Sequence, residues 1–173
     1  MISEIKESLN SNLYLTDDIK ENILELVTIF NNQFPNVDLT NLTGKLKTLQ
    51  IEKGSKFLFR GLSKYNPIEN KILITLSQLD DDTDCKHILM RELLNVITSK
   101  DNFTGFNNDN KYEALNIGYT EILANLLVGN ESVNEYEDEV IAANLMLSLI
   151  GSDNVFNAYF NNDINLILNV VGG

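Results

Sequence analysis

Hydrophobic residues recur at helical spacing over most of the chain. Ile19, Ile23, Val27 and Phe30 return every three or four positions, which is the pattern of a helix with one buried face. Thr16 stands just before this run. A threonine there can accept a hydrogen bond from the first helical turn, so it predicts where the helix begins.

The same periodicity predicts helices elsewhere. They cover residues 2–10, 83–99, 111–128, 134–150, 152–160 and 162–171. Two of them are followed at once by a glycine, Gly129 and Gly151, the residue type that most often ends a helix. The chain is therefore predicted to be helical on both sides of its middle.

The middle of the chain has a different pattern. Residues 45–51, 55–63 and 70–77 are short apolar or loosely alternating segments, separated by turn-forming residues. They predict a small three-stranded sheet, antiparallel or mixed, directly before the central helix 83–99. The predicted fold class is α+β and mostly helical, with a helical C-terminal half.

Length and charge limit the function classes. The chain has 173 residues and no linker-like segment, which predicts a single domain over 1–173. Its net charge of −12 argues against binding to nucleic acid or to anionic lipid, both of which need basic residues. Neither a secretory signal nor a membrane-spanning segment is visible, and Cys85 is the only cysteine. These features predict a cytoplasmic protein.

Two short segments carry the candidate chemistry. The first is "RELLN", residues 91–95, on the predicted central helix, and the second is "NIGYTE", residues 116–121, on the next helix. In zinc peptidases, two histidines four residues apart lie on one helix face and share a metal, with a glutamate after the first histidine as general base.

The pair of segments resembles the gluzincin branch of the zincin-like metallopeptidases, in particular small zincin-like proteins of low-GC Gram-positive bacteria. "RELLN" corresponds to the family's His-Glu-x-x-His, and "NIGYTE" to its Asn-Glu-x-x-Thr-Glu. The resemblance implies a zincin-like fold. It also implies a site formed by Arg91, Glu92, Asn95, Ile117 and Glu121.

The departures from the family pattern fall on the metal ligands. Arg91, Asn95 and Ile117 occupy the three ligand positions, and none of them is a competent zinc ligand. Glu92 and Glu121, at the positions of the general base and of the acid that orients a ligand histidine, remain acidic. The resemblance therefore implies the fold but argues against the activity, and we expect no metal, no cofactor and no confident catalytic residue.

The substitutions also predict a specific contact. If the two helices pack as in the family, the Arg91 guanidinium should bond Glu121, Glu92 or both, and fill the space of the metal. His87, one turn earlier, and Tyr119 are further candidates for the cleft. For His87 the alternative is an ordinary helix histidine in a hydrogen bond or at the surface, and for Tyr119 it is partly buried packing.

We therefore expect a catalytically inactive, zincin-like protein with a groove that binds a peptide or a protein. Two alternatives stay open. One is a hydrolase that uses Glu92 or Glu121 together with His87. The other is an acidic interaction or inhibitor protein without a site. The sequence predicts neither the partner nor the oligomeric state.

Overall fold

The chain folds into helices and one small sheet, and most of the helices lie close to where the hydrophobic periodicity predicts them. The computed structural model describes residues 1–54, 61–75, 82–106, 111–129 and 135–172. In chain order the elements are α1 Ile2–Ser11, α2 Asp17–Gln33, α3 Thr40–Leu46, β1 Gln50–Gly54, β2 Ser63–Asn66, β3 Lys71–Thr75, α4 Asp82–Ile97, α5 Glu113–Val128, α6 Glu137–Ile150, α7 Ser152–Phe160 and α8 Asn165–Gly172.

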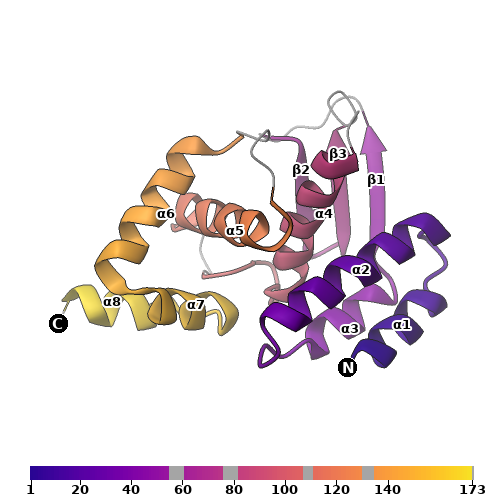
Figure 1. Ribbon diagram of the computed structural model, residues 1–173, viewed down its shortest axis with the longest axis horizontal. Coiled ribbons are helices and arrows are strands. Elements are labelled where there is room, and N and C mark those ends of the chain that lie inside the picture. Colours follow the sequence, from indigo (N-terminus) through magenta and orange to yellow (C-terminus); the bar gives the residue numbers. More distant parts are fainter. Residues whose placement is uncertain (55–60, 76–81, 107–110, 130–134, 173) are drawn as a thin grey trace.

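Helix α4 lies at the middle of the molecule (Figure 1). Helices α1–α3 and the sheet lie on one side of it, and α5–α8 lie on the other. One continuous cluster of buried apolar side chains runs through the molecule, from Ile5 in α1 to Ile167 in α8. The observed class is α+β and mostly helical. No described helix has the length and apolar character needed to cross a membrane.

The predicted start of α2 is confirmed. The Thr16 hydroxyl oxygen accepts a hydrogen bond from the backbone N–H of Ile19 at 3.4 Å, so Thr16 caps the helix. The repeating apolar residues lie on one face, and Ile23, Val27 and Phe30 are at most 1% exposed. Burial of this face against the rest of the core is what stabilises the helix in place.

The predicted strand 45–51 is wrong over most of its length, because residues 45–46 belong to α3 and residues 47–49 form the turn that leads into β1. Leu39, Leu42, Leu46 and Leu49 are all fully buried, and their spacing of three or four residues matches a helix and its exit turn. The prediction began at Lys45 and so missed the helical repeat. The second predicted strand, 55–63, overlaps β2 only at Ser63, and residues 55–60 lie outside the described part.

The sheet is mixed, which is one of the two predicted forms. Strand β3 lies between the other two, parallel to β1 and antiparallel to β2. Ile72 and Ile74 of β3 are buried while the residues between and beside them are partly exposed, which is the two-residue period of a strand. Among the described strands, β2 is therefore an edge strand.

Helix α4 is buried on nearly every side. Met90, Leu93, Leu94 and Val96 are at most 1% exposed, as expected of a helix at the centre of a core. The same helix carries His87, Arg91 and Glu92 into the interior, where each is no more than 3% exposed. Ionisable groups this deeply buried need partners, and those partners define the candidate site.

Candidate functional site

Helices α4 and α5 bring the two sequence segments into direct contact. The Arg91 Nη1 atom of α4 donates a hydrogen bond to Glu121 Oε1 of α5 at 2.7 Å. The Nε atom of Arg91 lies 3.3 Å from Glu92 Oε1. The predicted contacts of Arg91 with Glu121 and with Glu92 are thus both confirmed.

Two further segments complete the surroundings of Arg91. Its Nη2 atom donates to the Ser63 hydroxyl of β2 at 2.6 Å, and Nη1 also donates to Glu135, just before α6. The guanidinium carbon lies 5.2 Å from the centre of the Tyr136 ring, within range of a cation–π contact. Arg91 is 3% exposed, so the guanidinium is held by protein groups and not by solvent.

Electrostatics favour the charged forms of Arg91 and Glu121. Burial by itself disfavours the Arg91 cation, but Glu92, Glu121 and Glu135 outweigh it and raise the pKa of the guanidinium. Burial likewise opposes ionisation of Glu121. Hydrogen bonds and charge from His87 and Arg91 prevail, and the pKa of the Glu121 carboxyl is lowered.

His87 is bonded within the interior and does not reach the pocket. Its Nε2 atom lies 2.8 Å from Glu121 Oε2, and the side chain is fully buried. Glu121 therefore bridges His87 and Arg91, which stand one turn apart on α4. The Nδ1 atom of His87 makes no hydrogen bond to any residue that the structure describes.

Both carboxylate oxygens of Glu92 are engaged. Oε1 accepts a hydrogen bond from Ser63 Oγ at 2.6 Å and a longer one from Arg91, while Oε2 accepts one from the Asn95 amide at 3.0 Å. A general base needs an oxygen that can take a proton from water or substrate. Glu92 instead already accepts hydrogen bonds from three protein donors, Ser63, Arg91 and Asn95. This arrangement favours a structural role for Glu92.

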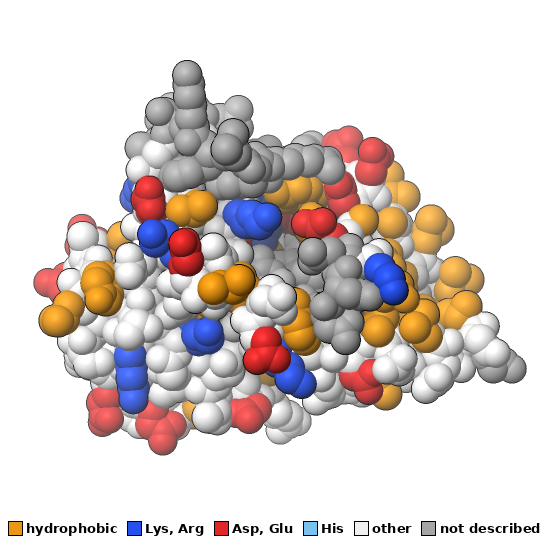
Figure 2. All heavy atoms as spheres, turned by 180° about the vertical axis from the view of Figure 1, so that it is seen from behind, with side chains coloured by type: hydrophobic (Ala, Val, Ile, Leu, Met, Phe, Trp, Pro, Cys, Tyr) orange, Lys and Arg blue, Asp and Glu red, His pale blue; other side chains and the backbone are white. Residues whose placement is uncertain are grey.

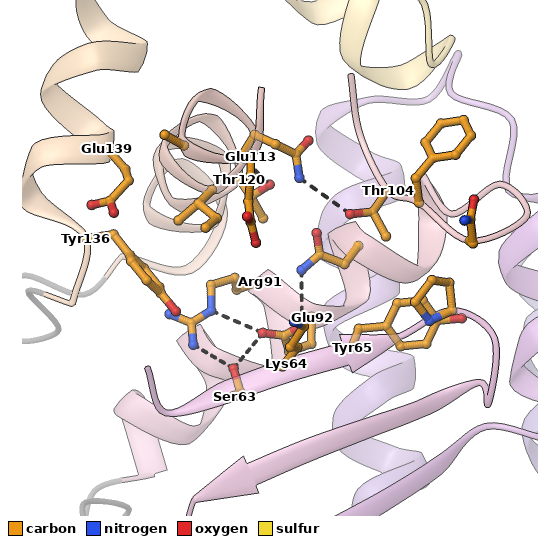
Figure 3. A pocket seen from close by; sticks show the side chains of 17 residues that line it. Ser63, Lys64, Tyr65, Arg91, Glu92, Thr104, Glu113, Thr120, Tyr136 and Glu139 are labelled. Carbon is orange, nitrogen blue, oxygen red and sulfur yellow. Dashed lines mark hydrogen bonds and ion pairs between the residues drawn. The ribbon is translucent and has the colours of Figure 1, made fainter. Parts of the chain in front are cut away.

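A pocket of about 580 Å³ opens beside the cluster (Figure 3). Its walls come from β2, α4, the segment 102–104, α5 and the start of α6. Figure 3 shows Ser63, Arg91 and Glu92 joined by hydrogen bonds at one side of the pocket, with Tyr136 and Glu139 on the side of α6. At that side of the pocket the polar side chains of Ser63, Arg91 and Glu92 are therefore already bonded to one another.

The structure separates the predicted site residues into two sets. Those that line the pocket are Arg91, Glu92, Asn95 and Ile117. Those that do not are Glu121, His87 and Tyr119, which are all at most 4% exposed.

Tyr119, a predicted cleft residue, belongs to the aromatic core. Its ring centre lies 5.6 Å from that of Phe106 and 5.0 Å from that of Tyr159. Burial raises the pKa of its phenol. The alternative reading of Tyr119 as packing is the better description, because the ring fills the space between α5 and α7.

The side chains at the family's ligand positions do not suit a zinc ion. Arg91 is a permanent cation held by three carboxylates, Asn95 donates its amide to Glu92, and Ile117 has no ligand atom. Within the described residues, no group of three or more His, Cys, Asp or Glu side chains is arranged to hold a metal. The chemistry of these side chains favours a salt-bridge cluster at this place.

Sequence reasoning missed several residues that complete the site. Ser63 comes from the edge strand, and Glu135 and Tyr136 come from the segment that precedes α6. The run "NEYEDE" is visibly acidic, but no local pattern tells which of its acids turns inward. Only the packing of α5 against α6 brings Glu135 to Arg91.

The Asn-initiated segment "NIGYTE" is also explained by its packing. Asn116 accepts a hydrogen bond from the backbone N–H of Phe106 at 3.2 Å, which ties α5 to the loop before it. A Cβ atom on Gly118 would lie 1.9 Å from the carbonyl oxygen of Glu139. Helices α5 and α6 therefore approach closely at Gly118, and this close approach brings the start of α6 to the pocket.

Known protein-family models, curated proteins and solved structures show no match to this chain.

Proposed function

We propose that this chain is a zincin-like protein without metallopeptidase activity, which binds an extended peptide segment in its pocket. The observation that carries the proposal is the position of Arg91. A buried guanidinium stands at the first ligand position of the motif and bonds the two acids, Glu92 and Glu121, that the family pattern retains. A cation has taken the place at which the family pattern would hold a metal.

The edge strand β2 supports a peptide as the ligand. The Thr75 N–H donates to the Leu62 carbonyl, which sets the alternation of hydrogen bonds between β2 and β3. In that alternation Ser63 and Tyr65 direct their backbone N–H and C=O groups away from β3. Both residues line the pocket. An extended peptide could add to this edge as a further strand and place side chains in the pocket.

The charges of the pocket favour a peptide with basic side chains. Among the residues that line it, Glu92, Glu113 and Glu139 are acidic, and Lys64 and Arg91 are basic. Arg91 and Glu92 are paired with each other in the buried cluster, so neither charge is offered to a ligand. Of the other charged residues that line the pocket, two are acidic, Glu113 and Glu139, and one is basic, Lys64. The whole chain also has a net charge of −12, which attracts a basic partner over a longer range.

A binding measurement tests this proposal. Two sets of fluorescent heptapeptides share a Thr/Val framework, and one set carries Lys where the other carries Glu. Binding is measured by fluorescence anisotropy. We expect the Lys set to bind saturably and the Glu set to bind at least about tenfold more weakly. Equal binding of both sets, or binding of neither, contradicts the proposal.

A matched pair of variants locates the binding site. Ala114 is exposed and lines the pocket, so Ala114→Trp fills part of the pocket without disturbing the core. Ser3→Trp makes a similar change at an exposed position of α1, away from the pocket. Binding should weaken in Ala114→Trp and stay unchanged in Ser3→Trp.

The zincin-like geometry has its own test. The triple variant Arg91→His, Asn95→His, Ile117→Glu restores the family's three ligand types. If the backbone geometry is zincin-like, the variant should retain one zinc per chain after dialysis, measured by elemental analysis, while the wild type retains far less. A triple variant that keeps its near-ultraviolet circular dichroism but holds no zinc would argue against the zincin-like fold.

A further inference from the structure

Helix α6 carries a row of large apolar side chains on its outer surface. Ile141, Leu145 and Leu149 are 59%, 62% and 81% exposed, and they follow one another at intervals of four residues. The opposite face of α6 is buried in the core. Monomeric proteins seldom leave such a continuous apolar row in water.

The surroundings of this row are apolar as well. Figure 2 shows hydrophobic side chains gathered over the side of the molecule where α6 and α8 lie. The exposed apolar residues of α8 are Leu166, Leu168, Val170 and Val171. The row on α6 is therefore part of a broader apolar surface, which points to an interface.

The charge of the segments around this apolar surface limits which partners can bind it. Residues 140–152 and 164–172 contain no charged residue, although the chain as a whole has a net charge of −12. No Lys, Arg or His follows Lys111 in the sequence. An apolar helix face that binds anionic membranes needs basic residues beside it, and α6 has none nearby in sequence. A second copy of this chain is a suitable partner for the apolar surface, because two such surfaces join without bringing charges together.

We propose that the chain forms a two-fold symmetric dimer in which α6 packs antiparallel against the same helix of a second copy. Leu145 lies at the two-fold axis and contacts Leu145 of the partner subunit. Ile141 contacts Leu149 of the partner subunit, and the symmetry repeats this contact. Rows at intervals of four residues interdigitate at a crossing angle of about −50°, with the helix axes about 8–10 Å apart.

The antiparallel direction follows from the acids at the start of α6. Glu137 and Asp138 lie in its first turn and are exposed. A parallel pair would place these acids beside their copies in the second protomer, where like charges repel. The antiparallel pair puts the two acidic ends far apart.

The first test is the mass in solution. At about 100 µM, well above a micromolar Kd, sedimentation equilibrium should give twice the chain mass of 19.5 kDa. Leu145→Glu puts two like charges at the axis and should raise the Kd more than about 100-fold. Leu13→Glu makes the same change at a residue that is 92% exposed in the turn after α1, and should leave the dimer intact. A monomeric wild type, or a dimeric Leu145→Glu, overturns the proposal.

The second test uses symmetry. Leu145→Glu and Leu145→Lys should each be monomeric, and an equal mixture of the two should dimerise, because position 145 faces its own copy. A mixture that remains monomeric overturns the proposed arrangement.

Cysteine cross-linking tests the direction of packing in a Cys85→Ser background. At the proposed axis spacing, facing Cα atoms come within reach of a disulfide. Leu145→Cys should therefore oxidise to a covalent dimer, whereas Leu149→Cys should do so only when mixed with Ile141→Cys. Efficient self-cross-linking of Leu149→Cys indicates parallel helices and overturns the proposal. So does a wild type that stays monomeric while binding phosphatidylserine vesicles.

Discussion

Arg91 forms ion pairs with carboxylates from three separate segments of the chain. Glu92 is its neighbour on α4, Glu121 lies on α5, and Glu135 precedes α6. Buried carboxylates without a cation are costly, because removing one partner of a buried ion pair leaves the other charge uncompensated.

We therefore expect Arg91→Met to lower the free energy of unfolding by about 3–5 kcal/mol at pH 7, measured by urea denaturation. Arg91→Lys retains the charge but not the planar set of donors that reaches Ser63, Glu92, Glu121 and Glu135 together. It should lower the free energy of unfolding by less than Arg91→Met does. A loss below about 1 kcal/mol in Arg91→Met would mean that the carboxylates do not depend on the guanidinium.

The lowered pKa of Glu121 predicts how stability depends on pH. The folded protein favours the ionised carboxylate, so this contribution is complete above the ordinary value of 4.5 and is lost as the pH falls below it. Between about pH 5 and 3 the unfolding free energy should fall less steeply in Glu121→Gln than in the wild type. Equal slopes in the two proteins would show that Glu121 does not titrate differently on folding.

At the scale of elements, the contact between α5 and α6 depends on a glycine. Gly118→Ala would force its Cβ against the Glu139 carbonyl and should destabilise the protein by about 1–3 kcal/mol. Gly44→Ala in α3 is the matched control. Nothing lies within 4 Å of a Cβ there, and alanine should stabilise the helix by about 0.5–1 kcal/mol. Thermal denaturation of both variants checks the opposite signs.

Most helices could be predicted because each has a buried face with its own local period. For α7 the prediction matches the observed bounds, and for α5 and α6 the predicted ends are confirmed. Helix α3 was not predicted, because it is short and its leucine repeat continues into the turn before β1. The partners of β3 could not be predicted either, since strand order depends on contacts between distant segments.

The candidate site was predictable only where it lies on two helices with a recognisable spacing. Arg91, Glu92 and Glu121 meet because α4 and α5 pack side by side. Ser63 and Glu135 carry no comparable signal, since neither belongs to a motif. Their place in the site follows from the edge position of β2 and from the close approach of α6.

At the scale of the whole molecule, acidic charge exceeds basic charge nearly two to one, with 25 acidic against 13 basic residues. Self-repulsion of this kind weakens the compact state, and salt screens it between exposed groups. Raising NaCl from about 10 mM to about 500 mM at a fixed low protein concentration should raise the melting temperature. A decrease would indicate that attractive surface ion pairs outweigh the repulsion.

The Arg91 cluster also bears on the order of folding. Apart from the bond to the adjacent Glu92, the hydrogen bonds of the Arg91 guanidinium join residues 28 to 44 positions apart, so they form only after α4, α5, β2 and the start of α6 have docked. Contacts of such long sequence separation, closed by side chains alone, are expected late in folding. Arg91→Met should therefore unfold much faster in stopped-flow experiments while its refolding rate changes little. The Arg91 guanidinium therefore determines the lifetime of the native state, through the unfolding rate, more than it determines the folding rate.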